Sequence, residues 1–587
     1  MSSIFQRLGR ALPERHAPGK NSFATEAKAL RDWIDHLPLA NPNATARLLM
    51  AALHEMNQLR LDPAQRFAAM ETLRPPCAQV VASLDRMVNA DVFPLPPAKQ
   101  QLGQQISEFD RELALGYTAL VYDICAPAGA VPFLRGKIVT AALVRAVQHN
   151  GALLYRAYLM YQAPPQGVWQ LLHDLFQFAV AVRVDEKRID DPLREGQPVS
   201  VRDSYIQSLL FALSNPYRFT QKENSEIHEL TRVLGGYCEL RPGRAPEGAI
   251  AVQVERDAGP GYLPEEREVP HDDVWAFQIS GLTRFLDNEL ALLPPGAEVV
   301  EFKPKGAARM KVGLELVERL THTWTGTAAR GHTRLPAGHR LDCVIGLHSV
   351  HYVLCDNMDF DAFLHSIRGV AISLRESDRI AAWTTSAAPE AARTMRTDVK
   401  VLDQSLSGYR VQWDRLDGVR VKVGELIALA PPTDDGEPQD WMIGAIRWIR
   451  FIDAGAMEAG ISLLSRRALP VGLRTFDSHR VPRAPMRGLL LEPLAGEDGS
   501  SARTILAPHL FDRNANEVEV MRPADPFDAV PAPVVELLQQ PRVIDRGSNA
   551  YLQILLESPE NGEQAADGGL APAAANDELA LAAGSHS

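Results

Sequence analysis

Apolar residues in the first 241 positions recur at steps of three and four, the spacing that places them on one face of an α-helix. Short breaks rich in proline, such as Pro75-Pro76 and Ala163-Pro164-Pro165, separate these segments. Proline-marked turns between amphipathic helices are typical of bundles and solenoids. We therefore predict an all-α domain over residues 1–241, built as a bundle or a solenoid. Its clearest apolar series is Leu102, Ile106, Phe109, Leu113, Tyr117 and Leu120.

The pattern becomes mixed between residues 242 and 329. Ile250, Val252 and Val254 alternate with other residues as in a strand, whereas the segments 274–293 and 310–320 have helical spacing. We assign residues 242–329 to a transitional region, which could be a separate domain or the end of the helical body.

Short segments in which apolar residues occupy every second position recur between about residue 330 and residue 475. This spacing indicates short, half-buried strands. Several such strands in series predict a small closed barrel. The apolar positions are Leu341, Cys343, Ile345 and Leu347, then Val399 and Val401, then Tyr409, Val411 and Trp413, then Val419, Val421 and Val423.

The chain after the barrel is again rich in strand patterns. Residues 486–557 contain four apolar runs punctuated by turns, which predict a second small barrel or an extension that covers the edges of the first. Residues 558–587 are rich in Ala, Gly and acidic residues and lack Lys and Arg. Because such a segment cannot bury enough apolar surface to order itself, we expect a disordered tail.

Length and composition limit the classes of function. A chain of 587 residues exceeds a single core, so about three or four domains are expected. The net charge of -12 argues against a general binder of DNA or RNA. Five scattered cysteines without a Cys-x-x-Cys pair fit a reducing cytosol. A transmembrane helix needs about 20 consecutive apolar residues, and no stretch of the sequence approaches this length. We therefore expect a cytoplasmic protein without a transmembrane segment.

The sequence contains no convincing catalytic motif. Leu134-Arg-Gly-Lys-Ile138 resembles the end of a phosphate-binding P-loop, but Val131 stands in place of the first glycine and Ile138 in place of the Mg-binding hydroxyl. His348 and His351 would lie on opposite faces of a strand, which disfavours a metal site. We predict neither an enzyme nor a cofactor or metal site.

The most informative stretch is the hexapeptide from Asp403 to Gly408, which connects two predicted strands. A carboxylate accepts N–H donors, and Ser405 donates or accepts beside it. Gly408 permits close approach of backbone and ligand. This combination predicts a binding corner. The alternative is a turn whose side chains bond only to their own backbone.

This arrangement resembles the PilZ domain, a six-stranded antiparallel barrel that binds the bacterial messenger cyclic di-GMP. The family motif is Arg-x-x-x-Arg followed by Asp/Asn-x-Ser-x-x-Gly, and the second half matches at Asp403, Ser405 and Gly408. For the first half, Arg330 and Arg334 lead directly into a good strand pattern. Arg375 and Arg379 form a second pair, but no comparable strand follows it. We prefer Arg330 and Arg334. The chain departs from the family at an insertion of about residues 356–396.

The resemblance implies a multidomain α+β receptor. Its barrel, at residues 330–475, would bind cyclic di-GMP through Arg330, Arg334, Asp403, Ser405 and Gly408, and the helical half would pass the state to a protein partner. A second hypothesis is a ligand-independent interaction scaffold that keeps a degenerate barrel as a structural module.

Overall fold

A computed structural model describes the chain at residues 2–20, 22–89, 92–194, 197–243, 250–262, 273–303, 309–325, 333–368, 394–433, 439–452, 455–477, 479–493, 503–525, 532–544 and 551–556. Two compact units contain them. The described residues before Ala329, apart from 92–94, form the first unit, and residues 92–94 with those from Ala329 onward form the second.

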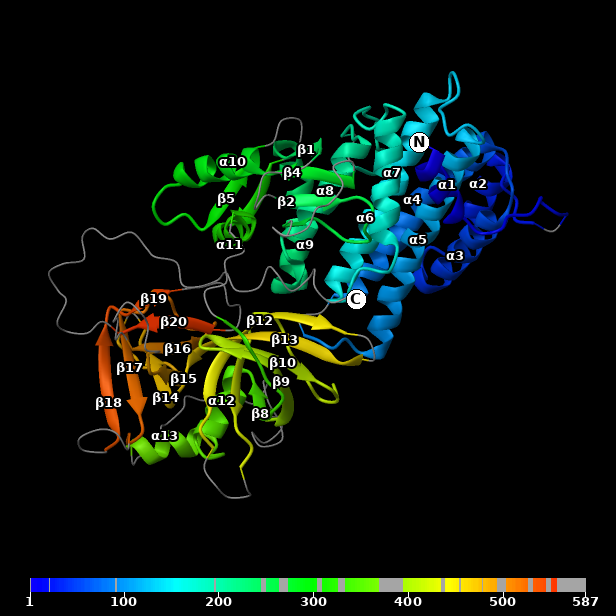
Figure 1. The fold of residues 1–587 in the computed structure, drawn as a ribbon. Helices are drawn as coiled ribbons and strands as arrows, with labels where there is room; N and C mark the ends of the chain where they lie inside the picture. The colour runs from blue at the N-terminus through cyan, green and yellow to red at the C-terminus, as the bar shows by residue number, and fades with distance from the viewer. Residues whose placement is uncertain are drawn as a thin grey trace. The chain divides into compact units, whose positions relative to one another are not determined.

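Long helices build most of the first unit, and α5 lies between α4 and α6 (Figure 1). This confirms the predicted helical N-terminal half. Side chains cap several of these helices; Asp62, for example, accepts the N–H groups of Ala64 and Gln65 at the start of α4. The helices are α1 (Ser2–Arg10), α2 (Ala27–Asp35), α3 (Pro42–Gln58), α4 (Pro63–Val88), α5 (Pro97–Cys125), α6 (Gly136–Leu159), α7 (Val168–Ala181), α8 (Val201–Leu213) and α9 (Gln221–Leu234).

One expected helix break is absent. Pro75-Pro76 lie inside α4, which continues for twelve residues beyond them to Val88. Proline in a helix interior removes a hydrogen bond and usually ends or kinks the helix. Here the apolar face of Leu73, Cys77 and Leu84 is buried on both sides of the prolines, so tertiary packing outweighs the local preference.

The segment that follows the helices is mixed, and two of its predicted helices are wrong in part. Residues 274–293 form strand β4 (Val274–Gln278) before α10 (Ser280–Ala291), and residues 310–320 form β6 (Met310–Gly313) before α11 (Leu314–Thr325). Strand β4 is central in its sheet, and Val274 to Phe277 are all buried. A strand buried on both faces has a continuous apolar run, which periodicity cannot distinguish from a helix. The other strands are β1 (Glu239–Pro242), β2 (Ile250–Gln253), β3 (Gly261–Tyr262) and β5 (Val299–Phe302).

A six-stranded antiparallel barrel forms the first part of the second unit, as predicted. The strand order is β10-β13-β12-β11-β8-β9, and pairing of β9 with β10 closes the barrel. Val399, Val401, Val411 and Trp413 are fully buried, as expected for alternate positions that face the barrel interior. The strands are β8 (Arg340–Ile345), β9 (Thr397–Ser405), β10 (Gly408–Trp413), β11 (Leu426–Ala430), β12 (Met442–Phe451) and β13 (Met457–Ser465), with the short β7 (Leu335–Pro336) added to β9.

The insertion between β8 and β9 contains α12 (Leu347–Leu354) and α13 (Phe360–Arg368). The first predicted strand therefore ends at Ile345, and His348 and His351 lie on a helix instead of a strand. Val350 and Val353 of α12 belong to a core that also includes residues of β11, β12, β15 and β16. Residues of β11 are buried on both faces because this core covers the outside of the barrel.

A second antiparallel sheet of seven strands follows the barrel and curls into a half-barrel. Its order is β18-β17-β14-β15-β16-β20-β19. The strands are β14 (Ala468–Thr475), β15 (Met486–Leu491), β16 (Thr504–Pro508), β17 (Glu517–Arg522), β18 (Val534–Gln539), β19 (Arg542–Ile544) and β20 (Tyr551–Leu555). The predicted tail, residues 558–587, lies outside the described residues.

Candidate ligand-binding site

The hexapeptide from Asp403 to Gly408 is a tight hairpin between β9 and β10. Ser405 pairs with Gly408, so Leu406 and Ser407 form the two-residue connection. Short β7 adds to the same place, because Leu335 pairs with Gln404 and Pro336 with Asp403. The residue before β7 is Arg334. Backbone pairing therefore brings Arg334 and the second half of the motif to one corner of the barrel.

A β-bulge determines which way Asp403 points. Val401 pairs with Val411, but Asp403 pairs with Arg410, so Leu402 is the extra residue. Without it, Asp403 would share the interior face with Val401, two residues earlier. The bulge re-aims the carboxylate to the outer face, beside the arginine.

Alternating charges run across the outer face from this hairpin. Arg334 donates from Nη1 to Asp403 Oδ1 at 2.6 Å, and Arg410 Nη1 lies 3.7 Å from Asp403 Oδ2. Arg410 also donates from Nη2 to Glu458 Oε2 at 2.9 Å, and Arg450 Nη2 lies 3.5 Å from the same oxygen. Glu458 is buried, with a side chain 7% exposed. These five residues, which we call the charge row, contain one more cation than anions.

The hairpin determines the contacts of Ser405 and Gly408, the two small residues of the motif. Ser405 Oγ lies 3.3 Å from Ser407 Oγ and donates to Gly408 O at 3.4 Å. A Cβ on Gly408 would lie 2.0 Å from the carbonyl oxygen of Ile461 on β13. The glycine is therefore required by the close approach of two strands, a reason that the sequence pattern alone does not reveal.

Four of the five predicted site residues thus lie together: Arg334, Asp403, Ser405 and Gly408. Arg330 lies outside the described residues, and so do Arg375 and Arg379 of the alternative pair.

Sequence reasoning missed Arg410, Glu458 and Arg450. Arg410 falls between Tyr409 and Val411, so its outward direction was predictable from alternation. Its contact with Asp403 was not, because that contact depends on the bulge. Glu458 and Arg450 lie on β13 and β12, where only the strand register brings them to Arg410.

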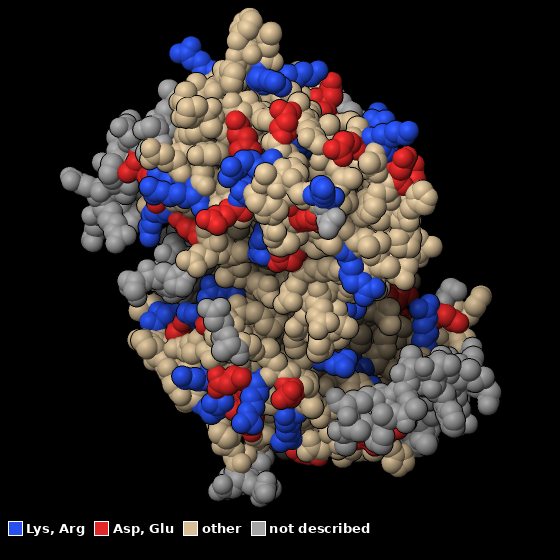
Figure 2. All heavy atoms as spheres, turned by 90° about the vertical axis from the view of Figure 1, so that its right-hand side faces the viewer, with Lys and Arg blue, Asp and Glu red and all other residues tan. Residues whose placement is uncertain are grey.

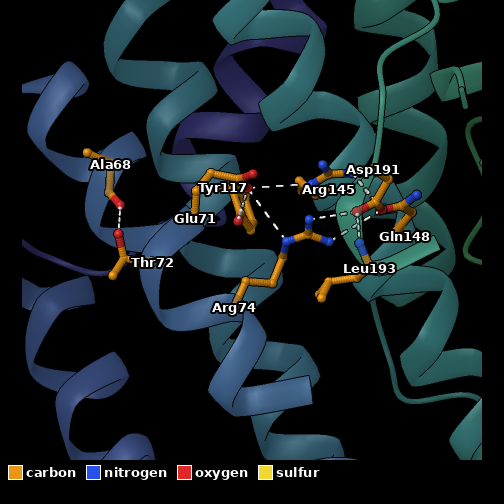
Figure 3. A network of polar contacts seen from close by, with 9 residues as sticks. All are labelled: Ala68, Glu71, Thr72, Arg74, Tyr117, Arg145, Gln148, Asp191 and Leu193. Carbon is orange, nitrogen blue, oxygen red and sulfur yellow. Dashed lines mark hydrogen bonds and ion pairs between the residues drawn. The ribbon is translucent and has the colours of Figure 1, made fainter. Parts of the chain in front are cut away.

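A second ionic cluster is buried in the helical unit (Figure 3). Arg74 and Arg145 both donate to Asp191, at 2.7 and 2.8 Å, and the side chain of Asp191 is 1% exposed. Burial alone would raise the pKa of Asp191, but the hydrogen bond from Arg74 and the charge of Arg145 outweigh it, so the pKa lies below its ordinary value. Tyr117 donates to Glu71 at 2.6 Å, and Glu71 lies within 3.6 Å of both arginines. The two cations, Arg74 and Arg145, therefore balance the two anions, Glu71 and Asp191, as expected for buried charges that stabilise a fold.

Two buried histidines lie elsewhere. His173 contacts the hydroxyl of Tyr205 at 2.6 Å and the carbonyl of Ala258 at 2.9 Å, and burial lowers its pKa to about 4. His351 is 1% exposed, and burial lowers its pKa to about 3. Among the described residues, no group of His, Cys, Asp and Glu could hold a metal ion. Across the same ranges, no helix is both long and apolar enough to cross a membrane.

The closed six-stranded barrel and its Asp-x-Ser-x-x-Gly hairpin define a PilZ-domain protein, and comparisons with known proteins specify the family. One family model, the N-terminal domain of the cyclic-di-GMP receptor FimW, matches residues 28–246. Another, the middle PilZ domain of the same receptor, matches residues 249–397 and 372–470. The chain belongs to the FimW family of cyclic-di-GMP receptors.

A curated relative is the cyclic-di-GMP receptor FimW of Pseudomonas aeruginosa. It is 25% identical over 539 residues, which cover 84% of this chain and 86% of the relative. No solved structure matches the chain. The family is described as a receptor and not by an enzyme name.

Proposed function

We propose that this protein binds cyclic di-GMP at the barrel corner formed by Arg334, Asp403, Ser405 and Gly408, with Arg330 supplying a further cation. The observation that carries the proposal is the 2.6 Å contact between Arg334 and Asp403. This contact joins Arg334, from the first half of the motif, to Asp403, 69 residues later in the second half. The chain belongs to a family of cyclic-di-GMP receptors.

The chemistry of the corner suits a guanine dinucleotide. An arginine has a planar fork that can bind a phosphate or the O6/N7 edge of guanine, and it can stack on the base. Asp403 can accept hydrogen bonds from guanine N1–H and the amino group. Ser405 and Gly408 hold the hairpin that carries this carboxylate.

The ligand must compete with the ion pair already present. Asp403 lies within reach of Arg334 and Arg410, and Glu458 holds Arg410 from the other side. A phosphate that binds Arg334 replaces the contact of Nη1 with Asp403 Oδ1, which frees this carboxylate oxygen for guanine. The excess of one cation attracts a dianion only weakly, so directional hydrogen bonds must supply most of the selectivity.

In this proposal, the bound state is passed to a protein partner through the helical half. Stacked helices commonly offer partner surfaces. Binding can change the output only if the ligand prefers one arrangement of the chain over another.

Calorimetric titration of variants tests the assignment of residues. Arg334→Ala should weaken binding by about ten- to a hundredfold, because a good bidentate contact contributes about 1–3 kcal/mol. Asp403→Ala should reduce the preference for guanine more than the attraction to phosphate. Arg340→Ala is the matched control, since Arg340 also lies on the barrel but is paired with Asp398 and Asp414. Equal losses for Arg334→Ala and Arg340→Ala would contradict the assignment.

Hydrogen exchange distinguishes the two arginine pairs. If Arg330 and Arg334 bind the ligand, exchange of residues 330–335 should slow when cyclic di-GMP is added. Protection near Arg375 instead would move the site to the other pair.

A ligand-independent scaffold is the second candidate. It is favoured by the ion pair that Arg334 and Asp403 already form, and by the hydrogen bond that Ser405 donates within its own hairpin. A wild-type protein that does not bind cyclic di-GMP but keeps a folded barrel would support the scaffold.

A further inference from the structure

The loop between α5 and α6 is unusual for a surface loop. Residues 126–134, which we call the apolar loop, have the sequence Ala-Pro-Ala-Gly-Ala-Val-Pro-Phe-Leu and contain no polar side chain. Phe133 is 90% exposed and Leu134 is 85% exposed. Single exposed apolar residues are normal, but a contiguous apolar segment marks an interaction site. The loop projects from the ends of α5 and α6, at the top of Figure 1.

The base of the apolar loop is anchored. Gly129 has φ +64°, and a Cβ added to it would lie 3.1 Å from the ring of Phe5 in α1. The Phe5 ring stacks on Tyr122 of α5 at a centroid distance of 4.9 Å. Gly129 is therefore buried at the base of the loop, whereas Phe133 and Leu134 are its two large apolar side chains that extend into solvent.

The tip also has an unfavourable backbone. Arg135 N–H donates to Pro132 C=O at 3.1 Å, which closes a four-residue turn with Phe133 and Leu134 at its centre. Leu134 has φ +68°, a conformation that favours Gly or Asn and is strained for leucine. The turn directs both apolar side chains into water, so neither backbone preference nor core packing explains a leucine here.

Basic residues follow the tip directly. Arg135 and Lys137 are exposed, and neither forms an ion pair with any described residue. They lie at the start of α6, where the helix dipole disfavours cations and where this helix has no acidic residue in its first turn. In Figure 2 a protrusion of uncharged atoms at the top of the molecule has Lys and Arg atoms beside it. The charges, like the leucine, are unfavourable for folding.

We propose that the apolar loop docks on an anionic lipid surface, with Phe133 and Leu134 entering the interface and Arg135 and Lys137 contacting the headgroups. An apolar tip that projects from the helices and carries adjacent cations suits the apolar boundary and negative surface of a bilayer. Docking of the apolar loop does not depend on nucleotide binding, because the proposed nucleotide site lies in the second unit.

Vesicle flotation of the full chain, without nucleotide, tests the proposal. The protein should float with vesicles of phosphatidylcholine and phosphatidylglycerol, and less with phosphatidylcholine alone or at high salt. The double variant Phe133→Ser/Leu134→Ser should bind the anionic vesicles about tenfold more weakly or worse. Leu510→Ser is the matched control, because Leu510 is also 90% exposed, and it should bind like the wild type.

A second variant separates docking from folding. Leu134→Gly should relieve the strained turn, so the unfolding temperature should stay the same or rise while vesicle binding falls. A fall in unfolding temperature with unchanged vesicle binding would overturn the proposal in favour of a structural leucine. Equal flotation of the wild type and the double variant would also overturn it. A wild-type protein that binds no vesicle would overturn the proposal as well, and would favour a pocket on a partner protein as the binding site of the apolar loop.

Discussion

Replacing Gly408 by alanine tests the explanation given for the motif glycine. A Cβ at this position would lie 2.0 Å from Ile461 O, 3.1 Å from its carbonyl carbon and 3.3 Å from Ser462 Cα. These are backbone atoms, so no flexible side chain can move away. Strands β10 and β13 would have to separate by about 1 Å or more, since Cβ contacts under 3.0 Å are essentially never seen.

The separation would have two consequences. It would strain the hydrogen bond from Leu463 N–H to Ser407 C=O, now 2.8 Å, and overpacking of this kind costs about 1–3 kcal/mol. It would also shift Arg410 relative to Glu458, its partner from β13. We therefore expect Gly408→Ala to lower the free energy of unfolding by about 1–3 kcal/mol and to weaken cyclic di-GMP binding.

Urea unfolding and calorimetric titration measure these effects, and faster hydrogen exchange in β10 and β13 would locate the loss in the barrel. Gly338→Ala is the control, because a Cβ on Gly338 meets nothing within 4 Å. If Gly408→Ala is as stable as Gly338→Ala and binds as well as the wild type, the strand-contact explanation is refuted.

Two further predictions concern buried charge in the helical unit. The pKa of His173 is about 4 in the folded chain against an ordinary 6.5, so the unfolded chain takes up the proton first as the pH falls. The contribution of His173 to the free energy of unfolding should be fully present above pH 6.5 and should fall by up to about 3 kcal/mol as the pH approaches 4. Urea unfolding at several pH values measures this decline, and His173→Gln should flatten it. Asp191→Asn would leave Arg74 and Arg145 buried without their shared counter-charge and should cost about 3–5 kcal/mol. Glu229→Gln, at an exposed pair with Arg232, should change the unfolding midpoint little, and equal effects of the two variants would contradict the network.

The sequence predicted the architecture where its pattern had a single structural meaning. The long amphipathic series from Leu102 to Leu120 lies in α5, and alternating Val399 and Val401 lie in β9. The pattern failed where packing decides the outcome. Strand β4 has the apolar run of a buried helix, and Pro75-Pro76 do not end α4 because its buried face continues past them.

The candidate site was predictable only in part, for a similar reason. Asp403, Ser405 and Gly408 are close in sequence, so their spacing and turn chemistry identify them. Arg410 and Glu458 join the corner only through a bulge and a strand register, neither of which leaves a distinctive local pattern. Gly408 was predicted as a motif residue for ligand approach, but the backbone of Ile461, which requires a glycine there, is 53 residues away in the chain.

The central claim is that the intact barrel corner binds cyclic di-GMP, and equilibrium dialysis of the wild-type chain tests it most directly. Labelled cyclic di-GMP should bind saturably, excess unlabelled cyclic di-GMP should displace it, and an equal excess of GMP should displace it far less. The same dialysis with Arg334→Ala should require about ten- to a hundredfold more ligand for half-saturation. Absence of saturable binding by the wild type at high ligand concentration would contradict the account.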